Sequence, residues 1–324
     1  MHRYISSLIH ERPYREAPGP QVITMGTFDG LHLGHQAIIK KTLAVAEEHG
    51  LESTAITFHP HPRYVLSGNK VPQLLPLEDR LDLLADMGIN HVWCINFDLE
   101  LAKLSAKEFF ELLSKWVVPA ALVVGENFRT GRNREAGVKE LDVLGQELGW
   151  ELISVPTLYI HGQPVSSTRI RHLLTQEGDV ESAASLLGRN YYIKGTVVHG
   201  EGRGRQLGYP TANLSVSSDL VVPCNGIYYC DAYLDEPSTQ PKVAAVSIGT
   251  RPTFGGGERT IEAYLLDWYG DLYDRTLKLE FIHRIRDELK FASVEDLIDQ
   301  MDRDVANIRS LASSRLRNQV QQNR

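Results

Sequence analysis

The chain has 324 residues, 42% of them hydrophobic, and can therefore bury enough apolar surface for the cores of two domains. Its formal net charge of −7 excludes a protein that holds nucleic acid through an overall positive field. Three cysteines without a CxxC pair favour free thiols in core positions. No segment has the length of a membrane span or the apolar core of a signal peptide, so we expect a cytoplasmic protein without membrane contact.

Strand-like and helix-like apolar patterns alternate from Val22 to about residue 188. The expected strands span residues 22–25, 54–58, 91–97, 121–124 and 151–155. The expected helices span residues 35–49, 77–88, 105–116 and 139–149. Gly50 ends the first helix, and Ser105 with Glu108 forms a capping box at the third. This alternation predicts a mostly parallel, doubly wound α/β sheet of the Rossmann type.

Beyond residue 191 the pattern changes to short alternating strands, divided by Gly, Pro, Asn and Asp. The expected strands span residues 191–199, 226–234, 242–248, 261–266 and 276–281. This pattern predicts an antiparallel β-barrel, on which a helix over residues 294–311 packs by its apolar spacing. The polar tail 315–324 is expected to fray. The sequence therefore predicts two domains, residues 1–187 and 188–324.

The string GTFDGLHLGH, residues 26–35, fills the turn between the first strand and the first helix. Glycines let the backbone approach an anion closely, a helix N-terminus offers unpaired N–H groups, and two imidazoles three residues apart can donate to one phosphate. A histidine pair also arises by chance, but here a strand, a helix and a second strand complete a βαβ unit around it. The turn is a predicted nucleotide-phosphate site whose residues are Gly26, Thr27, Phe28, His32, Gly34 and His35.

Three further strings belong to the same edge of the predicted sheet, where open α/β folds bind ligands. SSTRIR opens a helix and offers hydroxyls and a fork-shaped guanidinium to phosphate oxygens, although a serine–threonine cluster is also a common helix cap. FHPHP and GENFRTG each follow a strand, although each is also typical of a simple turn. The candidate residues are Ser166, Ser167, Thr168 and Arg171 in the first string, Phe58, Pro60 and His61 in the second, and Asn127 and Phe128 in the third.

In the second half, a glycine-arginine string at residues 195–205 leads into GYPTAN at residues 208–213. Its GxGxxG-like spacing is not followed by a helix, which excludes a dinucleotide-binding turn and leaves a hairpin loop as the plain alternative. The string is nevertheless dense in phosphate-binding groups: Gly200, Gly202, Arg203, Gly204 and Arg205. Thr211 and Asn213 offer hard oxygen ligands for Mg²⁺. Glu262 lies in an apolar strand and, beside such a loop, is a candidate general base.

The tetrad His32-Leu33-Gly34-His35 matches the HxGH signature of the adenylyl-transferring nucleotidyltransferases. Together with the other strings, it makes the chain resemble the prokaryotic bifunctional riboflavin kinase/FAD synthetase family from about Val22 to Asp304. GTFDGLHLGH, FHPHP, GENFRTG and VSSTRIR resemble the FMN adenylyltransferase half. The glycine-arginine loop, GYPTANL, SIGTRPTF, the strand with Glu262 and the segment 286–291 resemble the riboflavin kinase half.

The resemblance implies a nucleotidyltransferase domain followed by a riboflavin-kinase barrel, acting on riboflavin, FMN and ATP with Mg²⁺. It implies that Glu262 takes the ribityl proton while Thr211 and Asn213 hold Mg²⁺, and that the histidines, the SSTRIR residues and Arg171 act on the α-phosphate of ATP. The FHPHP and GENFRTG residues would bind flavin, and FMN and FAD would be products without a covalent link. A homo-oligomer stays open, as do two alternatives: a single-activity enzyme with a vestigial domain, and a non-catalytic flavin-binding regulator.

Overall fold

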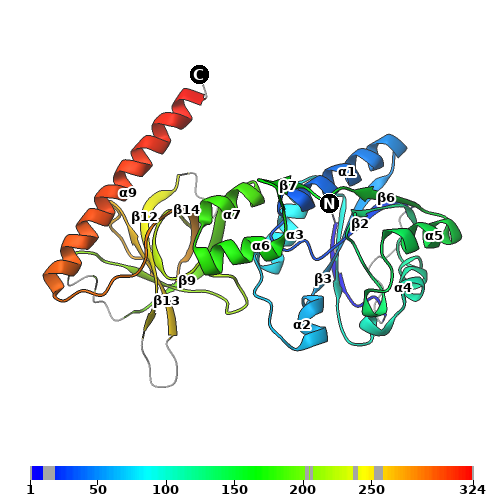
Figure 1. Cartoon of the computed structure of the whole chain (residues 1–324), viewed down its shortest axis with the longest axis horizontal. Coiled ribbons are helices and arrows are strands. Elements are labelled where there is room, and N and C mark those ends of the chain that lie inside the picture. The colour runs from blue at the N-terminus through cyan, green and yellow to red at the C-terminus, as the bar shows by residue number, and fades with distance from the viewer. Residues whose placement is uncertain are drawn as a thin grey trace. The chain divides into compact units, whose positions relative to one another are not determined.

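The computed structural model describes residues 2–9, 19–200, 204, 207–235, 240–251 and 258–322. The chain divides into two compact units, Met1–Ser167 and Thr168–Arg324, which Figure 1 colours from blue to green and from green to red. Among the described residues, no helix combines the length and the apolar character that crossing a bilayer requires.

The first unit is built on a six-stranded parallel sheet with the strand order β1-β4-β3-β2-β5-β6. The strands are β1 (His2–Ser6), β2 (Gln21–Met25), β3 (Glu52–His59), β4 (His91–Asn96), β5 (Pro119–Gly125) and β6 (Glu151–Val155). The helices are α1 (Leu33–His49), α2 (Pro62–Ser67), α3 (Leu77–Asp86), α4 (Ala106–Leu113) and α5 (Val138–Leu148), with short 3₁₀ turns at Leu101–Lys103 and Arg132–Arg134. A small hairpin pairs β7 (Tyr159–Ile160) with β8 (Gln163–Pro164). The predicted parallel α/β sheet is confirmed, and β1 is an additional strand.

Helices cover both faces of this sheet, because the strands are apolar on both sides. On one face, Val45 and Ala46 of α1 pack against Val22, Ala121 and Val123. On the other face, helices α4 and α5 contribute apolar side chains to the larger core cluster: Phe109, Phe110, Leu113, Leu141 and Leu144. The expected capping box closes the N-terminus of α4, where Ser105 Oγ accepts from Glu108 N at 3.2 Å. The doubly wound arrangement is thus confirmed.

The second unit is a closed antiparallel barrel with the strand order β10-β13-β12-β11-β14-β9. Its strands are β9 (Tyr191–Val198), β10 (Ala212–Ser215), β11 (Gly226–Leu234), β12 (Lys242–Arg251), β13 (Glu258–Leu265) and β14 (Thr276–Arg286). A helical segment precedes the barrel and consists of α6 (Ser167–His172), the π-helical turn η3 (Leu173–Glu177) and α7 (Val180–Leu187). Contacts group residues 168–187 with the barrel, and α7 packs on β9 and β14. The predicted barrel is confirmed, while the cut at 187/188 stays a prediction.

The last helix, α9 (Val294–Gln322), is longer than the sequence predicts. Ile308 and Ala312 are buried and pack against Tyr229 and Leu266, as the apolar spacing suggests. The expectation that residues 315–324 fray is wrong for the helical part up to Gln322. One cause is an ion pair: Arg315 Nη1 lies 2.5 Å from Asp231 Oδ2, and Asp231 is buried in the barrel wall, so this polar tail residue is held against the barrel.

Candidate functional sites in the two units

The first unit contains a cavity of about 900 Å³ at the carboxyl ends of its strands. Met25, Phe58, Gly125 and Val155 line it, so the ends of β2, β3, β5 and β6 converge there as expected for an open α/β sheet. The predicted site residues that line it are Gly26, Thr27, Phe28, His32, Gly34, His35, Phe58, His61, Asn127, Phe128 and Ser166. Pro60, although the structure describes it, does not line the cavity.

Two histidines at the start of α1 line this cavity. His32 is the N-cap residue, and its Nδ1 accepts a hydrogen bond from the backbone N–H of His35 at 3.2 Å. Because Nδ1 is an acceptor, the ring proton of neutral His32 is assigned to Nε2. The two rings stack with their centroids 3.6 Å apart and their planes 15° from parallel. Both imidazoles therefore face the same part of the cavity.

His35 is held as a neutral imidazole. Burial lowers the pKa of His35 well below its ordinary value, and the electrostatic interactions of His35 with His32 and with the Arg80 cation lower this pKa further. The Nδ1 atom of His35 is buried and has no hydrogen-bond partner among the described residues. This leaves Nε2 as the ring nitrogen available to a ligand in the cavity.

Gly34, between the two histidines, leaves little room for a side chain. A Cβ atom there would lie 3.2 Å from His32 Nδ1 and 3.7 Å from the carbonyl oxygen of Val165. Any larger residue would press on the ring that caps the helix. The glycine of the HxGH pattern therefore lets the backbone pass close to the His32 ring.

The SSTRIR string lies at the boundary of the two units. The Ser167 hydroxyl donates to the carbonyl oxygen of Asp29 at 2.8 Å, which ties the start of α6 to the GTFDG turn. Ser166 lines the cavity of the first unit, whereas Thr168 and Arg171 belong to the second unit. The phosphate contacts of Thr168 and Arg171 stay predictions.

Arginines that the sequence analysis did not assign also line this first cavity. They are Arg63 of α2 and Arg129 and Arg134 of the loop after β5. The guanidinium of Arg129 donates to the carbonyl oxygens of Arg134 at 2.8 Å and Glu135 at 3.3 Å, so it orders the loop. The string FRTGRNR follows a strand end and contains three arginines, and this pattern could have identified Arg129 and Arg134 as cavity residues.

The barrel contains a second cavity of about 340 Å³. Gly204, Thr211 and Glu262 line it, together with apolar side chains from α9 and the segment before it: Leu289, Phe291, Leu297, Met301 and Val305. Tyr209 and Tyr264 also line it and contact each other edge to face at 5.2 Å. Gly202, Arg203 and Arg205 of the predicted phosphate loop lie outside the described residues. The cavity lining thus combines polar and apolar side chains.

Three oxygen-bearing side chains lie close together around Glu262, and two of them, Thr211 and Glu262, line the cavity. The Thr211 hydroxyl donates to Glu262 Oε2 at 3.4 Å, and Asn213 of β10 lies opposite Glu262 of β13 in the ladder. Asn213, itself described, does not line the cavity. Gly200 and Gly204 pack closely here: a Cβ on Gly200 would overlap the Asn213 amide, and one on Gly204 would overlap the carbonyl of Tyr209. Glycine is needed at both positions for this close approach.

These donors fit Mg²⁺ bound together with a nucleotide. Among the described residues there is no group of three or more His, Cys, Asp or Glu side chains that could hold a metal on its own. Mg²⁺ is usually bound by one or two protein oxygens and completed by water and substrate phosphates. The Thr211 hydroxyl and the Asn213 amide beside the Glu262 carboxylate suit that mode.

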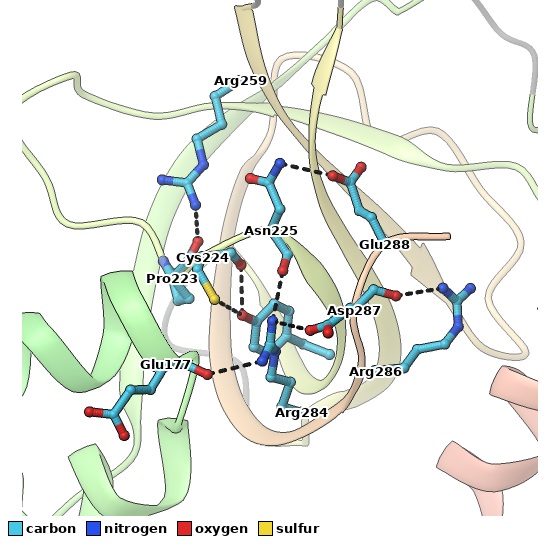
Figure 2. A network of polar contacts seen from close by, with 10 residues as sticks. Glu177, Pro223, Cys224, Asn225, Arg259, Arg284, Arg286, Asp287 and Glu288 are labelled. Atoms are coloured by element: carbon cyan, nitrogen blue, oxygen red, sulfur yellow. Dashed lines mark hydrogen bonds and ion pairs between the residues drawn. The ribbon is translucent and has the colours of Figure 1, made fainter. Parts of the chain in front are cut away.

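A polar network at the second cavity was not predictable from local sequence (Figure 2). Glu288 lines the cavity, and its Oε2 accepts from Asn225 Nδ2 at 2.8 Å. The carbonyl oxygen of Asn225 accepts from Arg284 Nη2 at 2.9 Å, and Arg284 Nη1 donates to the carbonyl oxygen of Glu177 at 2.9 Å. Figure 2 shows Arg284 between these two carbonyls. The network joins the end of η3 to the cavity wall.

A second buried ion pair fixes α9 at the same cavity. Arg286 contacts Asp304 with Nε at 3.0 Å from both carboxylate oxygens and with Nη2 at 2.6 Å from Oδ2. Gln300 Nε2 adds a hydrogen bond of 2.9 Å to the same carboxylate, which is buried. Both charged residues line the cavity, so this pair holds the helix that supplies the apolar wall.

Comparison with known proteins finds a matching family for each half of the chain. The sequence matches the FAD synthetase family over residues 14–169 and the riboflavin kinase family over residues 187–312. It is 35% identical over 296 residues to the bifunctional riboflavin kinase/FMN adenylyltransferase of Bacillus subtilis, covering 90% of this chain and 92% of that protein. It is 36% identical to the protein of that name from Escherichia coli, covering 87% and 90% of the two chains.

A crystal structure also has the same fold. The protein, described as a macrolide-efflux protein from Streptococcus pneumoniae, is 31% identical, with a TM-score of 0.83 over 91% of this chain and 96% of that one. The family predicted from the sequence is therefore confirmed. The chain belongs to the bifunctional riboflavin kinase/FMN adenylyltransferases, enzymes of flavin biosynthesis, with an FAD synthetase domain at the N-terminus and a riboflavin kinase domain at the C-terminus.

Proposed function

We propose that this chain makes FAD from riboflavin in two steps, one in each unit. In the barrel, the γ-phosphoryl group of ATP passes to the 5′-hydroxyl of riboflavin and gives FMN and ADP. In the first unit, FMN attacks the α-phosphorus of a second ATP and gives FAD and pyrophosphate. The observation that carries the proposal is that the two sets of motifs line two separate cavities, one with the stacked histidines and one with Glu262.

In the kinase step, Glu262 takes the proton from the ribityl hydroxyl as the oxygen bonds to phosphorus. Thr211, whose hydroxyl contacts Glu262, orients this carboxylate. Mg²⁺ would neutralise phosphate charge, and Thr211 and Asn213 are the residues that would hold it. Gly200 and Gly204, with Gly202, Arg203 and Arg205, would surround the phosphates. The apolar wall from α9 suits the flavin ring.

The adenylyl step needs no general base, because the phosphate of FMN is already ionised. Its catalysis is positioning and stabilisation of the charge that develops on the α-phosphate. His32 and His35 supply neutral N–H donors from parallel rings. Ser166 lies on the same cavity, and Ser167, Thr168 and Arg171 follow it at the start of α6.

The flavin of FMN would occupy the part of the first cavity formed by the two turns after β3 and β5. Phe58, His61 and Phe128 provide aromatic surface, and Phe58 is itself packed edge to face on Phe97 at 5.8 Å. Asn127 provides an amide, which donates to Thr157 Oγ1 at 2.8 Å. Pro60 lies within the first of these turns and shapes it without lining the cavity.

A one-pot assay tests this function. The full chain is incubated with riboflavin, ATP and Mg²⁺, and the flavins are separated over time. We expect FMN to appear first and FAD to follow at its expense. FMN without FAD would indicate a single-activity kinase, and FAD formed only from added FMN would indicate a single-activity adenylyltransferase. Consumption of neither flavin would indicate a binding protein and would contradict the proposal.

A further inference from the structure

Arg80 of α3 is a buried cation that the mechanism above does not use. Its side chain is only 2% exposed. Nη1 donates to the carbonyl oxygen of Thr27 at 2.6 Å, whereas Nε and Nη2 are buried and have no hydrogen-bond partner among the described residues. A guanidinium keeps its charge in proteins, and burying one with unmet donors costs free energy. An apolar residue would fill this place at a lower cost, so packing alone does not account for an arginine there.

A buried carboxylate lies in the same turn and balances the charge of Arg80. Asp29 is 1% exposed, and its Oδ1 accepts from the backbone N–H groups of Leu74 at 2.9 Å and Leu75 at 3.3 Å. Burial lowers the pKa of Arg80, and the negative charge of Asp29 acts against this lowering. The cation is therefore compensated electrostatically, and its one short hydrogen bond goes to the GTFDG turn.

The turn that receives this bond is strained and carries the phosphate-binding histidines. Phe28 and Leu31 adopt φ angles of 47° and 41°, a left-handed conformation that non-glycine residues rarely take. The Thr27 carbonyl oxygen, next to Phe28, accepts two hydrogen bonds. One comes from Arg80 Nη1, and the other comes from Thr57 Oγ1 at 3.1 Å. The Phe28 ring packs edge to face on His35, with centroids 5.4 Å apart. A shift at Thr27 would thus be transmitted through Phe28 to His35.

The charge of Arg80 also acts on His35. Burial lowers the pKa of His35 most. Two titratable groups lower it further: His32, in the same turn, and Arg80, from α3. The other groups around Arg80 are Asp29 and Cys94, and burial raises the pKa of Cys94 to about 11, so this thiol stays neutral. His35 consequently remains an uncharged donor when an anionic phosphate approaches.

We propose that Arg80 is a positioning residue for adenylyl transfer, which fixes the Thr27–Phe28 backbone from beneath and keeps His35 in place as a neutral donor to the phosphate. It touches neither substrate, since the cavity is lined by Thr27, Phe28 and His35 and not by Arg80 itself. The inference rests on the proposed adenylyl transfer in this cavity. The wild-type rate tests that reaction, and the variants below test Arg80.

The test compares Arg80→Met, which removes charge and donors, with Arg80→Lys, which keeps the charge. Arg3→Met is the matched control, because Arg3 pairs with Asp82 of the same helix on the surface. For Arg80→Met we expect kcat for FAD formation to fall by roughly 10- to 100-fold, as for a misplaced catalytic group, with the KM values for FMN and ATP unchanged. Loss of the cation should raise the pKa of His35, which a histidine titration followed by NMR measures independently of catalysis. Arg80→Lys should return this pKa to its wild-type position and recover part of kcat.

A further variant keeps the test decisive. Thr57→Val removes the other donor to Thr27 while keeping the cation, so kcat should fall without a change in the pKa of His35, even if Arg80→Met does not fold. Wild-type rates together with a wild-type pKa of His35 in both Arg80 variants would overturn the proposal. Equal loss of the kinase and adenylyl activities in Arg80→Met, with Thr57→Val unaffected, would assign Arg80 a purely structural role and would also overturn it.

Discussion

Asn213 of β10 lies directly opposite Glu262 of β13, so the antiparallel ladder itself brings the amide and the carboxylate together across 49 residues of chain. The neighbouring Thr211 hydroxyl reaches the same carboxylate at 3.4 Å. The barrel therefore places the carboxylate that we propose as the proton acceptor beside the hydroxyl and the amide that we propose as Mg²⁺ ligands. This juxtaposition is the structural basis for assigning the kinase step to Glu262.

Glu262→Gln should lower kinase turnover by roughly a hundredfold or more, the usual contribution of a general base, because glutamine keeps the shape and loses the proton acceptor. FAD formation from added FMN should not change. Glu280→Gln is a suitable control, since Glu280 is another barrel glutamate and pairs with Lys278 at 2.9 Å away from the cavity residues. Steady-state flavin separation measures both activities. A full kinase rate in Glu262→Gln would remove this residue from the mechanism.

His35→Ala should lower kcat for FAD formation by roughly two to three orders of magnitude, the usual effect of removing one oriented donor to a transition-state oxyanion. Binding of FMN and the kinase rate should stay as in the wild type. His49→Ala, at the exposed end of the same helix, serves as the control. If His35→Ala instead raises KM for ATP and leaves kcat intact, the imidazole contributes equally to ground and transition states and has no catalytic role.

The helical segment before the barrel leads to a prediction about where the chain can be divided. A fragment starting at residue 188 loses α7, whose Val180, Ala183, Leu186 and Leu187 are buried, and also the Leu174 carbonyl that accepts from Cys224 N at 2.8 Å. Each fully buried Val or Leu contributes roughly 1.5–3 kcal/mol before the cost of ordering the helix. We therefore expect a fragment of residues 168–324 to be more stable by several kcal/mol than one of residues 188–324. Urea denaturation of both fragments checks this, and equal midpoints would contradict it.

The three cysteines should differ sharply in reactivity. Cys94 and Cys230 are fully buried, and burial raises the pKa of Cys94 to about 11 and that of Cys230 well above its ordinary value. At about pH 8, roughly one in a thousand Cys94 side chains is a thiolate, so alkylation there is slow. Cys224 is only partly buried. Mass spectrometry after alkylation of the folded protein should find one labelled site, absent in Cys224→Ser; labelling of Cys94 at a similar rate would show that the core opens.

Local sequence patterns predicted the elements whose signals are local. The periodic segments from residue 22 to 155 became strands and helices near the expected bounds, and Gly50 and Ser105 ended and began helices as expected. The motif turns could be placed at one sheet edge because parallel strands share their carboxyl ends. The expectation of free thiols in cores fits Cys94 and Cys230, while Cys224 is only partly buried.

Features that depend on distant partners could not be predicted in this way. Strand β10 is four residues long, and its Ala212–Ser215 sequence follows a turn-like GYPT, so only pairing with β9 and β13 defines it. Helix α9 continues beyond residue 311 where Arg315 meets Asp231, 84 residues away. The role of Arg80 likewise depends on a carbonyl 53 residues earlier. Nothing in the local pattern of α3 distinguishes Arg80 from a surface arginine.

The most direct test of two independent active sites is complementation between two single-site variants. Glu262→Gln protein and His35→Ala protein are each incubated with riboflavin, ATP and Mg²⁺, separately and mixed, and FAD is measured over time. We predict that neither variant alone makes appreciable FAD, and that the mixture does, because FMN released by the His35 variant is adenylylated by the Glu262 variant. A mixture that forms no FAD, although each variant retains its remaining single reaction with added substrate, would contradict the account.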